Sequence, residues 1–280
     1  MKKTILFVSA AVAAFSAFLF WCNNSLTVSN YSVSPESLPD GFDGFRIVQI
    51  SDLHNKNFNG RLTRKIQELN PDIIVITGDI IDSYHTRTRI SVDFIEKIRS
   101  VAPIYYVTGN HESRIDEYPG FKDEIKKIGV NVLENEIAFI ERNGDEICLT
   151  GVDDITFFGS SLADESRIAF SQKLDELNAR SGEKTNILLS HRPELFDLYA
   201  KAGYDLVFSG HAHGGQIRLP FVGGFLSPGQ GLFPEYSEGI HKNGKTEMIV
   251  SRGLGNSLFP FRIFNRPEII VCDLKIRSSK

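Results

Sequence analysis

The segment Asp72-Ile-Ile-Val-Ile-Thr-Gly-Asp79 contains the strongest structural signal in this chain. Ile73–Thr77 is a run of five β-branched residues, which is typical of a strand buried on both faces of a parallel sheet. Gly78 and Asp79 follow at the carboxyl end of that strand, where parallel sheets present their functional groups. The segment therefore predicts an α/β fold with a site at the strand ends.

Further apolar runs end in polar motifs of the same kind, in this order: Asp52-Leu53-His54, Gly109-Asn110-His111-Glu112, Ser190-His191 and Gly210-His211-Ala212-His213. Gly151-Val152-Asp153-Asp154 is a weaker member of the series. Because the carboxyl ends of parallel strands share one edge of a sheet, these separate motifs are expected to converge on one crevice. Carboxylate, imidazole and carboxamide groups without a thiolate are typical of hydrolytic sites for borderline or hard divalent metals.

Segments with helical periodicity lie between the first predicted strands. Apolar residues recur with helical spacing in three sets: Leu62, Ile66 and Leu69; Val92, Ile95 and Ile98; Phe121, Ile125 and Ile128. This alternation predicts right-handed βαβ units. In the second half, Asn143-Gly144 predicts a hairpin turn, residues 162–180 a helix, and Pro193 the start of another helix. The whole pattern predicts a two-sheet α/β sandwich.

The bulk composition narrows the functional classes. With 280 residues, 41% hydrophobic and 24% charged, the chain has the composition of an ordinary globular protein. Its net charge of −4 gives no support for a nucleic-acid partner. Three cysteines are too few for a disulfide framework, and Cys148 and Cys272 are expected as buried thiols. A disulfide between these two in an oxidising compartment is the alternative.

The N-terminus predicts a membrane segment. Lys2 and Lys3 precede an uncharged apolar run over residues 5–22, which is long enough to span a bilayer. The Ala11-Val12-Ala13 motif lies inside the run, so cleavage there would leave too short a signal core. Trp21 before Cys22 argues against a lipoprotein. An uncleaved anchor is therefore favoured, and secretion after signal cleavage is the alternative.

Four regions follow from this interpretation. They are a cytoplasmic N-terminus (1–4), a transmembrane anchor or signal segment (5–22), a linker (23–44) and a catalytic domain (45–280). The linker is polar and rich in Pro and Gly, with a possible short strand around residues 26–33. Because the basic residues precede the run, the positive-inside rule places the domain outside the cytoplasm.

Histidine placement supports the metal site. Five of the seven histidines lie just beyond predicted strand ends, beside Asp, Asn, Gly or Ser: His54, His111, His191, His211 and His213. Residues i and i+2 of an extended segment point the same way, so Asp52 and His54 are expected to reach one ion. His85 and His241 lack such settings and are expected to be ordinary surface residues.

Taken together, the motifs D-x-H, G-D, G-N-H-E, an isolated His and G-H-x-H resemble those of the calcineurin-like metallophosphoesterase superfamily. The resemblance is collinear and runs from about Phe45 to the C-terminus. It implies a four-layer αββα sandwich of two mixed sheets with a binuclear metal centre. The N-terminal transmembrane helix would precede this domain.

The resemblance also implies roles for individual residues. One metal would be held by Asp52, His54, Asp79 and His213, and the other by Asp79, Asn110, His191 and His211. His111 would be catalytic, stabilising the transition state or protonating the leaving oxygen. Glu112 is expected either to orient His111 or to be a plain surface carboxylate. Asp153 and Asp154 are expected to support the ligands from behind or to be structural. Arg114 or Arg252 would supply positive charge to the substrate.

The neighbours of the motifs favour particular substrates. Protein phosphatases of this superfamily carry arginines beside the G-D and G-N-H-E motifs, whereas this chain has Ser83-Tyr84 and Thr108 there. This favours a phosphodiester or pyrophosphate bond over a phosphoprotein monoester. Residues 190–194, 211–218 and 251–255 resemble bacterial membrane-associated phosphodiesterases. UDP-2,3-diacylglucosamine pyrophosphatase activity in lipid A synthesis is the leading alternative.

An uncharged segment, residues 219–233, carries several aromatic and aliphatic side chains. Phe259, Phe261 and Phe264 follow later. These residues are expected either to form an apolar lip for acyl chains or the bilayer, or to pack on the domain's own core.

The sequence thus predicts a monomeric, membrane-anchored hydrolase that acts on a lipid- or envelope-linked phosphodiester or pyrophosphate. Two divalent ions would activate the attacking water. The mixed ligands permit Mn, Fe, Zn or Mg, with manganese preferred. The minor alternatives are a metal hydrolase of a different bond and a non-catalytic binding module.

Overall fold

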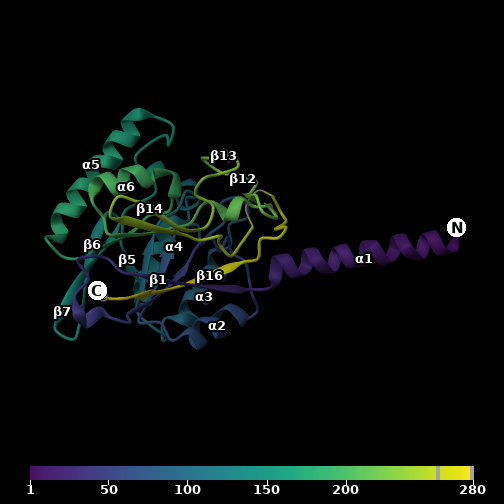
Figure 1. Cartoon of the computed structure of the whole chain (residues 1–280), viewed down its shortest axis with the longest axis horizontal. Coiled ribbons are helices and arrows are strands. Elements are labelled where there is room, and N and C mark those ends of the chain that lie inside the picture. The colour runs from purple at the N-terminus through teal and green to yellow at the C-terminus, as the bar shows by residue number, and fades with distance from the viewer. Residues whose placement is uncertain (257–258, 278–280) are drawn as a thin grey trace.

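Two six-stranded mixed sheets pack face to face in the computed structural model, which describes residues 1–256 and 259–277. The strand orders are β1-β16-β2-β3-β4-β5 and β14-β15-β9-β8-β7-β6. Figure 1 shows α2 and α3 below the sheets and α5 and α6 above them. The predicted four-layer αββα sandwich is confirmed.

The first sheet consists of β1 (Thr27–Val33), β2 (Arg46–Ile50), β3 (Ile73–Thr77), β4 (Ile104–Val107), β5 (Asn131–Val132) and β16 (Glu268–Leu274). Strands β2 to β5 run parallel, as the βαβ pattern predicted. The helices between them are α2 (Arg61–Leu69), α3 (Thr88–Ile98) and α4 (Tyr118–Lys127). Their apolar faces cover the outer face of this sheet.

The second sheet consists of β6 (Glu136–Arg142), β7 (Asp145–Gly151), β8 (Asn186–Leu189), β9 (Leu206–Ser209), β14 (Gly239–Asn243) and β15 (Thr246–Val250). Its outer face is covered by α5 (Asp164–Ser181) and α6 (Phe196–Ala202). Asn143 and Gly144 have φ values of 55° and 86°, so they form the predicted tight turn between β6 and β7.

Smaller elements complete the fold. Two short hairpins pair β10 (Arg218–Leu219) with β11 (Gly223–Gly224), and β12 (Leu226–Ser227) with β13 (Gly231–Leu232). The short 3₁₀ helices are η1 (Asp40–Phe42), η2 (Glu112–Arg114), η3 (Ile155–Phe157), η4 (Pro193–Leu195) and η5 (His213–Gly215).

An apolar core fills the space between the sheets. Val75, Leu189, Phe208 and Ile270 are fully buried there, and they come from strands of both sheets. Because side chains on both faces of β3 are buried, its continuous β-branched run is explained. This core fixes the two sheets against each other and so brings their carboxyl strand ends together.

The segment predicted as a linker, residues 23–44, contributes to this sandwich. β1 pairs in parallel with β16 over its whole length, and Phe42 is fully buried beside Phe45. β1 lies at the edge of its sheet and is mostly only partly buried, so its sequence can contain several polar residues. Because a polar edge strand has a composition similar to that of a flexible linker, the sequence pattern indicated a linker here.

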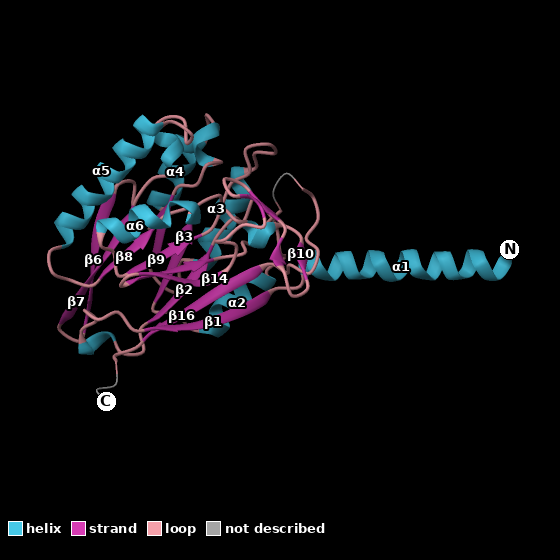
Figure 2. Ribbon diagram, turned by 45° about the horizontal axis from the view of Figure 1, so that its top comes forward, coloured by secondary structure: helices cyan, strands magenta, loops and turns pink. Residues whose placement is uncertain are grey.

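Helix α1 (Lys2–Asn24) leaves the domain as a single extended rod (Figures 1 and 2). It is long and apolar enough to cross a membrane, and it contains the predicted segment 5–22. The three cysteines, all within the described residues, are buried as free thiols.

Candidate metal centre

The predicted ligands gather where the two sheets meet. Asp52, Asp79 and Asn110 follow β2, β3 and β4 of the first sheet, while His191 and His211 follow β8 and β9 of the second. All five side chains are buried. Motifs separated by up to 159 residues therefore meet in one place, as their positions at strand ends predicted.

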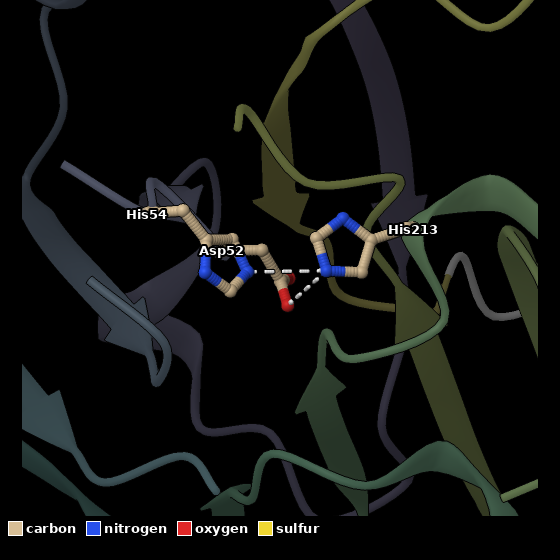
Figure 3. A group of neighbouring side chains, drawn as sticks. All are labelled: Asp52, His54 and His213. Atoms are coloured by element: carbon tan, nitrogen blue, oxygen red, sulfur yellow. Dashed lines mark hydrogen bonds and ion pairs between the residues drawn. The ribbon is translucent and has the colours of Figure 1, made fainter. Parts of the chain in front are cut away.

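One group of ligand atoms comes from Asp52, His54 and His213. The two histidines face each other with 3.2 Å between their Nε2 atoms, and His213 Nε2 lies 3.4 Å from Asp52 Oδ1. Figure 3 shows the three side chains pointing toward a common centre. They can therefore bind the same ion.

A second group comes from Asp79, His191 and His211. His191 Nε2 lies 3.1 Å from Asp79 Oδ2 and 3.1 Å from His211 Nδ1. The same Asp79 oxygen is 3.8 Å from His54 Nε2, which belongs to the first group. Asp79 thus stands between the two groups of ligand atoms.

The chemistry of these atoms fits divalent ions. Two nitrogens that each lie about 2.0–2.1 Å from one ion are about 3.0–3.4 Å apart, which matches both histidine pairs. Asn110 Oδ1 is buried and, among the described residues, has no hydrogen-bond partner. A buried acceptor without a partner is costly, and a cation would satisfy it.

Most of these ligands lie in an uncommon backbone conformation. Asp52, His54, Asp79, His211 and His213 have φ values between 48° and 63°, in the left-handed region. The extended geometry expected for the Asp52–His54 pair is therefore wrong, because the chain turns sharply beyond β2. Such conformations cost free energy and concentrate at functional sites.

Two glycines allow the β3 and β4 loops to touch. A Cβ at Gly78 would lie 2.6 Å from the Cα of Gly109, and a Cβ at Gly109 would lie 2.3 Å from Asp79 Oδ1. Neither position accepts a side chain without moving the neighbouring loop. These glycines therefore serve the close approach of two ligand-bearing loops.

Hydrogen bonds orient the ligands. His191 Nδ1 lies 2.8 Å from the carbonyl of Thr77, so Nδ1–H donates to that oxygen and Nε2 is free for an ion. The Asp52 carboxylate accepts from the backbone N–H of His211 at 3.1 Å. Each sheet thus orients a ligand of the other.

Burial and charge set the protonation of the site. Burial raises the pKa of Asp52 to about 6 and lowers the pKa of His54 to about 4. Burial would also raise the pKa of Asp79, but His191 and His111 hold it well below its usual range. Burial opposes the charging of His191, yet Asp79 raises its pKa to about 10. Asp79 is therefore ionised and needs positive charge around it.

His111 lies beside these two groups and forms a third group of close ligand atoms with His54 and Asp79. Its Nε2 is 3.9 Å from Asp79 Oδ2, and its Nδ1 accepts a hydrogen bond from the backbone N–H of Ser83 at 2.9 Å. A backbone amide only donates, so the neutral imidazole carries its proton on Nε2. That proton is available to the cavity in front of the ligands.

Glu112 has a different neighbourhood from the one expected. Its carboxylate accepts backbone N–H groups from Asp79 at 2.9 Å, Gly109 at 2.8 Å and Ile81 at 3.2 Å. It thereby joins the β3 and β4 loops, whereas Ser83 contacts the ring of His111. Burial raises the pKa of Glu112 to about 7.

The two aspartates after β7 bind neighbouring groups. Asp154 Oδ2 accepts from Arg192 Nε at 2.7 Å, and Asp153 Oδ1 accepts from Thr108 Oγ1 at 2.8 Å. Arg192 in turn lies 3.4 Å from His211 Nε2. Asp154 therefore fixes an arginine against a ligand of the second group.

Arg252, which with Arg114 was one of two candidate sources of positive charge for the substrate, forms ion pairs with Glu268 at 2.8 Å and Glu238 at 3.4 Å. Arg114 and Arg192 line the cavity in front of the ligand groups, which has a volume of about 310 Å³. The other lining residues include Asp79, Asn110, His111, His211, His213, Ser161, Leu162, Pro228 and Gly229. Positive charge at this cavity therefore comes from Arg114 and Arg192.

A family profile described as calcineurin-like phosphoesterase matches residues 45–215. The chain belongs to this family. It is 31% identical to the uncharacterized metallophosphoesterase YkuE of Bacillus subtilis over 258 residues, covering 89% of this chain and 86% of that protein.

Two other similarities extend this result. A zebrafish transmembrane protein with a metallophosphoesterase domain is 29% identical over 89% of this chain, which spans 57% of that protein's length. The solved structure of TT1561 from Thermus thermophilus aligns with a TM-score of 0.50 over 75% of this chain and 89% of that chain. Its 15% identity makes this a likeness of fold alone.

Three residues contact histidines of the metallophosphoesterase site, and the sequence did not predict these contacts. Ser83 contacts His111, Arg192 contacts His211, and Arg262 is fully buried 3.4 Å from His213 Nδ1. Ser83 and Arg192 are adjacent to recognised motifs, and that adjacency was the available signal. Arg262 stands 49 residues from its histidine, with no local pattern to indicate the contact.

The shared position of Asp79 predicts that Asp79→Asn weakens the binding of both ions. Asparagine tolerates the left-handed conformation, so the variant removes the charge with little backbone strain. Elemental analysis should show manganese falling from two ions per chain towards none. Asp93→Asn, at a partly exposed position on α3, serves as the control and should retain both. Two tightly bound ions in Asp79→Asn would contradict the bridging position.

The contacts of Glu112 predict that its replacement also weakens metal binding. Glu112→Gln places an NH₂ donor where the carboxylate accepts backbone N–H groups, so the two ligand loops should separate. Manganese affinity measured by calorimetry should fall by about 10–100-fold, as for other groups that support ligands. The exposed Glu117→Gln is the matched control. Unchanged affinity would show that these hydrogen bonds do not position the ligands.

Proposed function

We propose that this chain is a two-metal phosphodiesterase or pyrophosphatase that acts at a membrane surface. The supporting observation is the position of Asp79, whose Oδ2 lies 3.1 Å from His191 and 3.8 Å from His54. One carboxylate between two groups of histidines suits two ions that share a ligand. Manganese is the preferred ion among Mn, Fe, Zn and Mg.

The proposed ligands are those implied by the family resemblance: Asp52, His54, Asp79 and His213 for one ion, and Asp79, Asn110, His191 and His211 for the other. Two ions bound there would polarise the phosphoryl group and acidify a water molecule. The buried imidazoles favour their neutral, ligand form at His54, His211 and His213, since burial lowers their pKa values.

His111 is the proposed catalytic residue. Because Ser83 occupies its Nδ1, the imidazole presents a proton on Nε2 to the cavity. The proton can be donated to the leaving oxygen as the bond to phosphorus breaks, or hydrogen-bonded to a phosphoryl oxygen that gains charge. Asp79 Oδ2 lies 3.9 Å from Nε2, so the proton on Nε2 faces the carboxylate that stands between the two groups of ligand atoms.

The charges around the cavity favour a diester or pyrophosphate over a monoester dianion. Arg192 is paired with Asp154 at 2.7 Å and with Glu194 at 3.3 Å, so its charge is partly balanced. Arg114 is exposed and lines the cavity. Ser83 stands beside His111 where the related protein phosphatases carry an arginine. A singly charged phosphodiester group fits this limited positive charge.

Helix α1 supports a membrane location. We propose that it spans the membrane as an uncleaved anchor, with residues 1–4 in the cytoplasm and the catalytic domain outside. We also propose that the substrate is lipid- or envelope-linked and that the enzyme is a monomer. UDP-2,3-diacylglucosamine remains the alternative substrate, on the motif resemblance over residues 190–194, 211–218 and 251–255.

A substrate panel tests this proposal. Purified full-length enzyme with Mn²⁺ is expected to hydrolyse bis-p-nitrophenyl phosphate much faster than p-nitrophenyl phosphate, and a chelator should abolish both activities. Turnover of UDP-diacylglucosamine would identify the alternative substrate. Faster monoester hydrolysis would contradict the diester assignment. Two bound ions without turnover of any phosphorus substrate would indicate another bond or a binding module.

His111→Ala tests the catalytic residue. The variant should keep both ions, since His111 is absent from the proposed ligand sets, while kcat for the diester falls by about 10²–10⁴-fold. Metal content and turnover are measured on the same preparation. His85→Ala, at an exposed position, should behave as the unmodified enzyme. Loss of an ion in His111→Ala would instead identify His111 as a ligand.

A further inference from the structure

A group of apolar side chains is exposed on the loops beside the end of α1. Phe221 and Val222 project from the β10–β11 turn, while Phe259, Phe261 and Phe264 project from the loop before β16. All five are at least 43% exposed, and Phe221 is completely exposed. Figure 2 places β10 next to the point where α1 leaves the domain. We call this group the aromatic rim.

The contact between Phe264 and helix α1 fixes the position of the aromatic rim along the axis of that helix. The ring of Phe264 lies 5.0 Å from that of Phe18. Phe18 precedes the helix end at Asn24 by about 9 Å along the axis, since each helical residue adds about 1.5 Å. Residues 2–17 of the helix are exposed, so contact with the domain begins at Phe18.

The apolar run is about as long as the bilayer core is thick, so α1 has little freedom to move along the bilayer normal. Residues 5–22 provide about 27 Å of apolar helix, whereas a hydrocarbon core is about 30 Å thick. Moving Phe18 out into water would draw Lys2 and Lys3 into the apolar layer. If α1 spans the membrane, Phe18 lies inside that layer, and Phe264 must lie at its edge.

Basic side chains surround the same end of α1. Lys56 and Arg61 donate to the carbonyl oxygens of Asn23 and Asn24, which are among the last carbonyls of the helix. Arg266 lies 4.9 Å from the ring of Trp21. An aromatic layer next to basic groups is the usual composition of a protein surface at lipid headgroups.

We propose that this face of the domain is seated on the bilayer, with the aromatic rim in the interfacial layer and Lys56, Arg61 and Arg266 among the headgroups. The inference rests on the proposed retention of α1 as a membrane anchor. Two rim residues, Phe221 and Val222, belong to the same uncharged segment 219–233 as Pro228 and Gly229 of the β12–β13 turn, which line the metal cavity. A lipid-linked phosphodiester would therefore reach the site from the membrane surface.

Fluorescence quenching in liposomes tests this placement. Full-length protein is reconstituted into vesicles of phosphatidylcholine and phosphatidylglycerol, with a nitrobenzoxadiazole label on a new cysteine. Phe221→Cys and Phe264→Cys report on the rim, Ser9→Cys on the anchor, and Ile168→Cys on exposed α5, away from α1 (Figure 1). The native cysteines are buried, and unmutated protein gives the background labelling. Phe221 is fully exposed, so its replacement should not disturb folding.

Nitroxide-bearing lipids are expected to quench the labels at positions 9, 221 and 264 and to spare the label at 168. Quenching at position 9 alone would overturn the seating of the domain while leaving the anchor in place. No quenching at position 9 would overturn both the anchor and the inference. Turnover of a soluble diester, measured on the same samples, reports separately on the proposed hydrolase activity.

Discussion

Burial of the Asp79 carboxylate is the constraint on which the metal centre depends. A charge removed from water must be matched by hydrogen bonds and opposite charge. The backbone N–H of His111, which donates to Asp79 Oδ1 at 2.8 Å, supplies part of this. The facing histidine nitrogens leave room for further positive charge on both sides, as does Asn110 Oδ1, which has no hydrogen-bond partner in the part of the chain that the structure describes. Two cations at a single carboxylate would satisfy all of these groups together.

The sequence predicted the architecture because its signals are local. The β-branched run before Asp79 identifies a buried strand, and helical spacing identifies α2, α3 and α4. Strand ends then place the motifs, so the gathering of Asp52, His191 and His211 followed from topology alone. Their backbone conformation did not follow, since a left-handed residue beyond a strand is selected by its tertiary surroundings and not by its neighbours in sequence.

The features that the sequence did not predict are contacts between residues that are far apart in the sequence. Glu112 binds amides of two loops that only the folded sheet brings together. Arg262 is fully buried because backbone carbonyls of Arg252 and Gly255 accept its guanidinium hydrogens. Lys56 and Arg61 lie at the end of α1, although the sequence between the apolar run and Arg46 has no basic residue. Charge near a membrane anchor is thus a property of the fold as well as of the flanking sequence.

The pairing of β1 with β16 joins the first strand of the chain to the last. Thr27 lies opposite Glu268, so the whole catalytic domain must be synthesised before this edge of the sheet can close. Contacts between such distant residues make folding slow, because a large loop has to be ordered first. During biosynthesis the unpaired β1, already adjacent to α1, offers an open edge to other chains. This edge of the sheet can therefore close only after residues 27–274 have all been synthesised.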